Sequence, residues 1–214
     1  MNVQYPAQLE VDYPDQLNRV TTLFRWLLAL PVVALLSILT GDGGEVITVN
    51  ETGEVVNRAS DGAGGILTAL FLATAAMIVI RQRYPRWWFD FAQELTRFTA
   101  RVGVYLFGLS DRYPSTEEKQ SVHLDLTYPD VPKDLNRWLP LVKWLLAIPH
   151  YVVLVVLLAV GLVAAVVGWL AVLITGRYPK PIFDYLVGVG RWSLRVNAYA
   201  FLLVTDQYPP FSLR

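Results

Sequence analysis

The chain has 214 residues, of which 54% are hydrophobic and 17% charged, and its 18 basic and 18 acidic side chains balance to a net charge of zero. Because cysteine is absent, disulfides, thiolate catalysis and thiolate metal sites are excluded. The apolar residues form long unbroken runs, which are typical of transmembrane helices. The composition therefore predicts an integral membrane protein, for which no nucleic-acid partner is expected.

Residues 1–16 form a polar, acid-containing segment, so a soluble lead-in without a cleavable signal peptide is expected. Within it, Leu9 and Val11 alternate with Glu10 and Asp12, a period of two that is typical of a short strand. The same alternation recurs at residues 124–129. The pattern predicts two short strands that are candidates to pair with each other at the membrane surface.

The first apolar block predicts a membrane helix at about residues 22–40 and a second at about 63–81, joined by a polar loop over 41–62. Arg25, near the start of the first run, is interpreted as a snorkelling cation. The loop contains two β-type runs around the turn ETGE, which predict a small β-hairpin. Five acids and a single base lie in the loop, so the positive-inside rule places it outside the cell and the N-terminus in the cytoplasm.

An amphipathic helix is predicted at about residues 86–109. Asp90, Arg97 and Arg101 are spaced seven and four residues apart, which puts them on one stripe of this helix. Burying such charges in a bilayer costs about 2.5 to 3.5 kcal/mol each. The spacing and this cost favour a helix that lies along the cytoplasmic surface rather than one that spans the membrane.

Two blocks of sequence occur twice. LNRVTTLFRWLLALP at 17–31 matches LNRWLPLVKWLLAIP at 135–149, and both are followed by an apolar run and an Arg-Tyr-Pro motif. In the second copy Asp184, Arg191 and Arg195 stand in register with the stripe of the first copy. The sequence therefore predicts a tandem duplication, with a first repeat at 1–119 and a second at 120–214, related by an axis along the membrane normal.

The second repeat lacks the polar loop, since 29 residues separate Pro149 from Tyr178 whereas 53 separate Pro31 from Tyr84. A single helix over the apolar run would be about 48 Å long, against a hydrocarbon core of about 30 Å. The run is therefore interpreted as two membrane helices, at about 138–159 and 162–176, with a tight turn near Gly161. A second interfacial helix is expected at about 181–204.

The predicted fold is an all-α membrane protein with two parallel tandem repeats, both termini in the cytoplasm and a location in the bacterial plasma membrane. Each repeat is expected to be a transmembrane helical hairpin followed by a cytoplasmic interfacial amphipathic helix. Short strands precede each repeat, and the hairpin in loop 41–62 is extracytoplasmic.

The ordered motifs LNR…WLLAIPH and RYP…FD…VGV.RW..RV.AY..LL.TD.YPPF resemble the bacterial family called domain of unknown function 4389. The resemblance covers nearly the whole chain as two copies, of which the second is closer to the family pattern. The first departs from it, for example with Val32 where the second has His150. The resemblance implies a membrane location and a bacterial origin, and it brings no established activity or catalytic residue.

The paired arginines are the most informative candidate site. Arginine forks suit lipid phosphates at a membrane surface, so Arg97, Arg101, Arg191 and Arg195 are candidate ligands for an anionic phospholipid. The alternative is architectural: each aspartate, Asp90 and Asp184, would form an ion pair with an arginine of its own stripe and fix how the helix docks. Their duplication favours the architectural interpretation.

His150 follows Pro149 inside a predicted membrane helix, where an ionisable side chain is a functional hypothesis by default. The alternative, which is favoured, is that it bonds a carbonyl freed by the adjacent proline. No metal site, cofactor or catalytic constellation is predicted. Seven of the eleven tyrosines precede proline, so each Tyr-Pro pair is interpreted as a corner with the tyrosine ring as an interfacial anchor.

The leading functional hypothesis is a non-catalytic scaffold or accessory subunit of a larger bacterial membrane complex, with the bilayer and other membrane-protein subunits as partners. The second hypothesis is a lipid- or small-solute-binding or transport protein that uses the arginine stripes.

Overall fold

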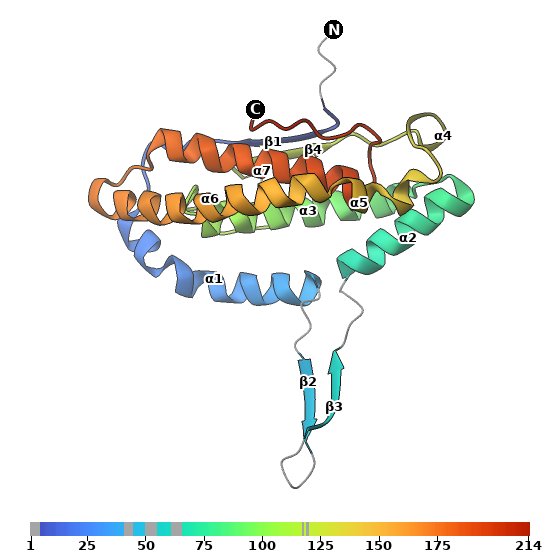
Figure 1. Ribbon diagram of the computed structural model, residues 1–214. Helices are drawn as coiled ribbons and strands as arrows, with labels where there is room; N and C mark the ends of the chain where they lie inside the picture. The colour runs from blue at the N-terminus through green and yellow to red at the C-terminus, as the bar shows by residue number, and fades with distance from the viewer. Residues whose placement is uncertain (1–4, 41–44, 50–54, 61–65, 117, 119) are drawn as a thin grey trace.

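The computed structural model describes residues 5–40, 45–49, 55–60, 66–116, 118 and 120–214, and these are mostly helical (Figure 1). In chain order, the elements are β1 (Ala7–Val11), α1 (Arg19–Thr40), β2 (Glu45–Val49), β3 (Val55–Ser60), α2 (Ile66–Arg81), α3 (Arg86–Leu106), β4 (Val122–Leu126), α4 (Val131–Asp134), the 3-10 turn η1 (Leu139–Leu141), α5 (Lys143–Leu146), α6 (Ile148–Thr175) and α7 (Lys180–Ala200).

The two strands predicted from alternating residues are confirmed, and they pair with each other. β1 and β4 form an antiparallel two-stranded sheet, called the ribbon below, in which Leu9 lies opposite Leu124 and Glu10 opposite His123. The leucines are buried on the inner face, whereas the two polar residues are exposed on the outer face. A period of two thus divides each strand into a core side and a water side.

The two helices predicted to be amphipathic pack against the ribbon, a contact that the sequence patterns do not predict. α3 packs against β4 and α7 against β1. On their other sides, α3 contacts α1 and α7 contacts α6. The main hydrophobic core lies between the ribbon and these helices and includes residues such as Leu9, Phe89, Leu124 and Phe183.

The predicted turn near Gly161 is wrong, because α6 is one continuous helix of 28 residues (Figure 1). Gly161 is a packing position: a Cβ added there would lie 3.2 Å from Leu186 Cδ2 of α7. Glycine alone costs a helix only about 1 kcal/mol, and the flanking residues are all helix-compatible and apolar. Contact with α7 along one face holds the helix in a single piece.

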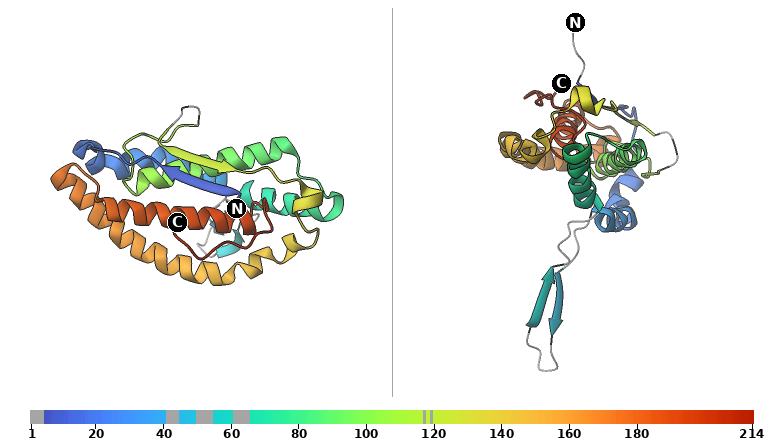
Figure 2. Two further views of the ribbon diagram at one scale, coloured as in Figure 1. Left: turned by 90° about the horizontal axis from the view of Figure 1, so that it is seen from above. Right: turned by 90° about the vertical axis from the view of Figure 1, so that its right-hand side faces the viewer.

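The predicted helical hairpin of the first half is also wrong. α2 continues in the general direction of α1 instead of running back beside it, and the β2–β3 hairpin leaves from the junction between them (Figures 1 and 2). That small hairpin is confirmed by its antiparallel register, although its turn, ETGE, lies outside the described residues. α1 packs mainly against α3 and α6, and α2 contacts η1, so that Ala29, Val32 and Ile78 are buried against other parts of the protein.

Two helices among the described residues are long and apolar enough to cross a membrane, namely Arg19–Leu39 of α1 and Ile148–Thr175 of α6. In each, only 22% of the most apolar window is buried inside the protein. Most of their leucine, isoleucine and valine side chains therefore point outward, which a protein surrounded only by water rarely tolerates.

Two of the tyrosines predicted as interfacial anchors lie in the core instead. Tyr84 and Tyr178, which follow α2 and α6, are only 3% and 1% exposed. Their hydroxyls donate hydrogen bonds to the carbonyls of Leu202, at 3.1 Å, and Phe107, at 3.2 Å. Burial raises the pKa of Tyr178 to about 12. Through these hydrogen bonds, the turn after α2 is held to the end of α7, and the turn after α6 is held to the end of α3.

Candidate functional site

The first arginine of each predicted stripe clamps one strand of the ribbon. Arg97 donates through Nε and Nη2 to the carbonyl of Leu124, at 3.3 and 2.9 Å. Arg191 donates through Nε to the carbonyl of Leu9, at 2.8 Å. Because Leu9 and Leu124 face each other in the ribbon, the two clamps act at the same level from opposite sides.

The second arginine of each stripe holds a segment that follows its helix. Arg101 donates to the carbonyl of Ser115, and Arg195 to the carbonyl of Ser212. Both arginines are largely buried, and burial lowers the pKa of each guanidinium from its usual value. Arginine remains charged at neutral pH despite such a shift. All four candidate arginines thus bond backbone carbonyls of this chain.

The acidic residues of the stripes pair differently from the prediction. Asp90 lies 3.2 Å from Arg86, and Asp184 lies 3.2 Å from Lys180, each one helical turn upstream. The predicted ion pairs with the stripe arginines are therefore wrong, since the nearer base at the solvent-exposed start of each helix takes the carboxylate. All four of these side chains are more than half exposed, so each pair contributes little to stability.

A buried ion pair that the sequence interpretation missed ties α1 to the end of α3. Arg25, interpreted as a snorkelling cation, is only 1% exposed and lies 2.6 Å from Asp111. Its Nη1 atom also donates to the Tyr105 carbonyl at 2.9 Å, and its Cζ atom lies 5.1 Å from the centre of the Tyr105 ring. Asp111 in turn accepts the backbone N–H of Asn18 at the start of α1.

The same arrangement recurs in the second half. Lys143 of α5, which is 0% exposed, lies 2.6 Å from Asp206 and donates to the Thr205 carbonyl at 2.7 Å. The amine is 5.3 Å from the centre of the Tyr199 ring, and Asp206 accepts the backbone N–H of Asn136. Burial lowers the pKa of Lys143, and the ion pair with Asp206 opposes that shift.

A signal for these pairs was present in the sequence. Arg25 and Lys143 occupy the same place in the two copies of the repeated block, and Asp111 and Asp206 both precede a Tyr-Pro corner by two residues. A basic and an acidic residue that recur together in otherwise apolar blocks are expected to find each other, because an isolated buried charge is costly.

His150 is enclosed by aromatic rings. It is 0% exposed, and its Nδ1 atom accepts a hydrogen bond from Trp192 Nε1 at 3.1 Å, which places the imidazole proton on Nε2. Its ring stacks on Phe211 with centroids 4.1 Å apart. The partner is thus an indole rather than the predicted freed carbonyl. Among the described residues Nε2 has no hydrogen-bond partner.

The polar groups therefore serve mainly to hold segments together. Within the described ranges, no group of three or more His, Asp or Glu side chains is placed to bind a metal ion. The buried cations are matched by carboxylates or carbonyls of the chain itself. The outer ribbon face is among the surfaces that remain open to water, with Glu10, His123 and Asp125 exposed on it.

In comparison with known families, residues 138–212 match the model of a domain of unknown function (DUF4389). The match covers the C-terminal part of the chain. It begins just before η1 and runs through α5, α6 and α7 into the C-terminal tail. No curated protein and no solved structure matches the chain. The matched region contains Lys143, His150, Trp192 and Asp206, so the second ion pair and the aromatic enclosure lie within it.

Proposed function

We propose that the protein is a non-catalytic membrane scaffold or accessory subunit, which is embedded through α1, α2 and α6 and presents the outer ribbon face to a partner protein. The observation that carries this proposal is that the exposed surface of the three helices is mainly apolar, whereas charged side chains are exposed on the outer ribbon face. Residues 26–40, 66–80 and 144–176 contain no Asp, Glu, Lys or Arg. Exposed apolar side chains of the three helices, such as Leu30, Leu72 and Val163, lie within these stretches. Such a surface suits hydrocarbon.

The proposed orientation follows from where the polar elements lie. The ribbon and both described ends of the chain are on one side of the helices, and the β2–β3 hairpin projects from the opposite side (Figure 1). With the ribbon in the cytoplasm, the hairpin would face outward, in agreement with the excess of acids in loop 41–62. Because α1 and α6 run roughly across the direction from the ribbon to the hairpin, they would then lie roughly along the membrane plane between the two polar regions (Figure 1).

A tandem origin is part of the proposal. It is supported by contacts that recur at matching positions, namely the Arg97 and Arg191 clamps on the ribbon and the buried ion pairs of Arg25 and Lys143. Identical roles in two copies are expected of architectural residues. The arginine-based lipid hypothesis has less support, because these guanidinium groups bond backbone carbonyls of the chain.

Single-cysteine labelling tests the placement directly, since the natural chain has no cysteine. We would make Gln8→Cys on the ribbon, Val163→Cys on the outer face of α6 and Ser60→Cys on β3, and treat sealed vesicles with a membrane-impermeant maleimide. Gln8→Cys and Ser60→Cys should label from opposite sides, and Val163→Cys only after detergent is added. Labelling of Val163→Cys in intact vesicles would contradict a lipid-facing α6.

Co-purification tests the scaffold role. A tagged copy should be purified from its host in mild detergent and its native mass determined, next to a variant with Glu10→Lys and Asp125→Lys on the outer ribbon face. A stoichiometric partner that the charge reversal removes is expected. Asp184→Lys, an exposed reversal at the start of α7, serves as the matched control. A native protein without any partner would refute the scaffold role.

A further inference from the structure

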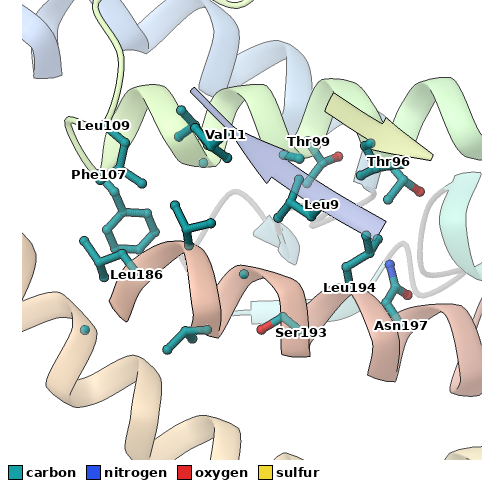
Figure 3. A pocket seen from close by; sticks show the side chains of 18 of the residues that line it. Leu9, Val11, Thr96, Thr99, Phe107, Leu109, Leu186, Ser193, Leu194 and Asn197 are labelled. Atoms are coloured by element: carbon teal, nitrogen blue, oxygen red, sulfur yellow. The ribbon is translucent and has the colours of Figure 1, made fainter. Parts of the chain in front are cut away.

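An apolar cavity of about 340 Å³ lies between α3 and α7, beneath the ribbon. Leu9 and Val11 of β1 close it from the ribbon side (Figure 3). Leu158 and Gly161 of α6 line it as well. Its volume lies within the range of about 300 to 1,000 Å³ that is typical of small-molecule sites. Several residues that line it, including Leu124 and Leu194, belong to the main hydrophobic core, yet side chains do not fill it.

Small residues on the facing helices keep this space open. Ala100 and Gly103 line it from α3, and Gly190 and Ser193 from α7. A Cβ added at Gly103 would meet no atom within 4 Å, so the wall has room for a larger residue that the sequence does not supply. Because protein interiors are normally close-packed, such unfilled apolar space invites an apolar ligand.

The two ends of the cavity differ in polarity. Phe107, Leu109 and Leu186 surround one end, whereas Asn197 lies at the other, on the side of Thr96 (Figure 3). The Thr96 hydroxyl already donates to the Ala92 carbonyl. Among the described residues, no hydrogen bond engages the side-chain amide of Asn197.

Asn197 lies between this cavity and a second one. The same residue lines a second apolar cavity, of about 480 Å³, which Phe71 of α2, Trp144 of α5 and Phe201 help to form. Both cavities adjoin helices whose outer faces are apolar and exposed. A ligand with a long apolar part and one polar group would thus meet hydrocarbon-like walls on both sides of a single amide.

We propose that the cavity between α3 and α7 binds one acyl chain, with the Asn197 amide donating a hydrogen bond to the carboxyl or ester oxygen at its head. The chain belongs either to a free fatty acid or to a membrane phospholipid, which share this chemistry. Only the delivery of the ligand from the bilayer rests on the proposed membrane placement, because cavity and amide are present in the protein itself.

The test uses the full chain, purified in mild detergent, depleted of lipid and titrated with the fluorescent fatty acid cis-parinaric acid. Gly103→Leu places four carbons in the cavity and should weaken binding about 100-fold, from the methylenes it displaces. Asn197→Ala should weaken it about fivefold through the lost hydrogen bond. Ala76→Leu adds three carbons at an exposed position of α2, outside both cavities, and should bind like the natural chain.

Mass spectrometry of lipid extracted from the protein before depletion identifies the source: a fatty acid or a phospholipid would each support the site and name the ligand. Ala100→Leu, on the same wall, replaces Gly103→Leu if that variant fails to fold by circular dichroism. Undetectable binding of cis-parinaric acid, or equal binding by a folded cavity-filled variant, would overturn the proposal. Because binding is measured in detergent, such a failure would leave the cysteine labelling and the membrane placement untouched.

Discussion

Replacing Asp206 by asparagine should expose the cost of the buried amine of Lys143. In the natural protein the amine is 0% exposed and lies 2.6 Å from the Asp206 carboxylate. In Asp206→Asn its remaining strong partner is the Thr205 carbonyl, at 2.7 Å. Removing one member of a buried ion pair costs about 3 to 5 kcal/mol, and the partial exposure of Asp206 favours the lower end of that range.

The loss should depend on pH, because lysine can release its proton. Burial already lowers the pKa of Lys143 below its ordinary value of 10.5, and Asp206 opposes that shift. Without the carboxylate the folded-state pKa falls further, while the unfolded-state value stays near 10.5. Between the two values the unfolded chain binds more protons than the folded one, so stability rises with pH. The deficit of Asp206→Asn should therefore shrink from pH 7 to pH 9.5.

The first half of the chain supplies a matched control. Asp111→Asn leaves Arg25, 1% exposed, in the same position, but a guanidinium keeps its proton throughout this range. Its deficit should be of similar size at pH 7 and should not recover at pH 9.5. Unfolding in mild detergent, followed by circular dichroism at both pH values, measures each difference. A deficit of Asp206→Asn that is equal at both pH values, or no larger than that of the exposed-pair variant Asp184→Asn, would refute the reasoning.

Three further predictions concern packing and the clamps. Gly168→Ala should destabilise the protein by about 1 to 3 kcal/mol, because the new Cβ would lie 2.3 Å from the buried ring of Tyr178; a lower Tm checks this, and an unchanged Tm would contradict the close contact. Arg191→Met should free a strand carbonyl at a cost of about 1.5 to 3 kcal/mol and speed amide exchange in β1; exchange that matches the natural protein would argue against a clamp. His150→Phe should keep the ring stacking but leave the Trp192 N–H unpaired, at about 1 to 3 kcal/mol, with a change in tryptophan fluorescence; identical fluorescence and stability would show that the indole bond has no role.

The elements that the sequence predicts well are those with a local periodic pattern. The alternation around Leu9 and Leu124 specified two strands, and their shared lead-in position suggested their pairing. The spacing of Asp90, Arg97 and Arg101 specified an amphipathic helix, which is present as α3. In both cases the pattern reports which face of an element is buried, and that is a property of neighbouring residues alone.

The features that were missed depend on partners distant in the chain. Arg25 and Asp111 are 86 residues apart, so no local rule connects them, and a lone cation in an apolar run was interpreted as facing the membrane surface. The continuity of α6 was missed for a related reason. Length alone argued for two short helices, whereas the contact of Gly161 with Leu186 shows that α7 supports the helix at the point where a turn was expected.

The break between α1 and α2 has a practical consequence. Counting from the shared Pro and Tyr landmarks, Thr40 and Ile66 correspond to Leu158 and Val160, where α6 passes without interruption. The hairpin is therefore an appendage joined at a point where the architecture does without one. A reporter domain or epitope inserted into the sequence that joins β2 to β3 should leave the ribbon and both cavities unchanged. The β2–β3 connection is thus a suitable insertion site, where foreign sequences can be exchanged without changing the rest of the fold.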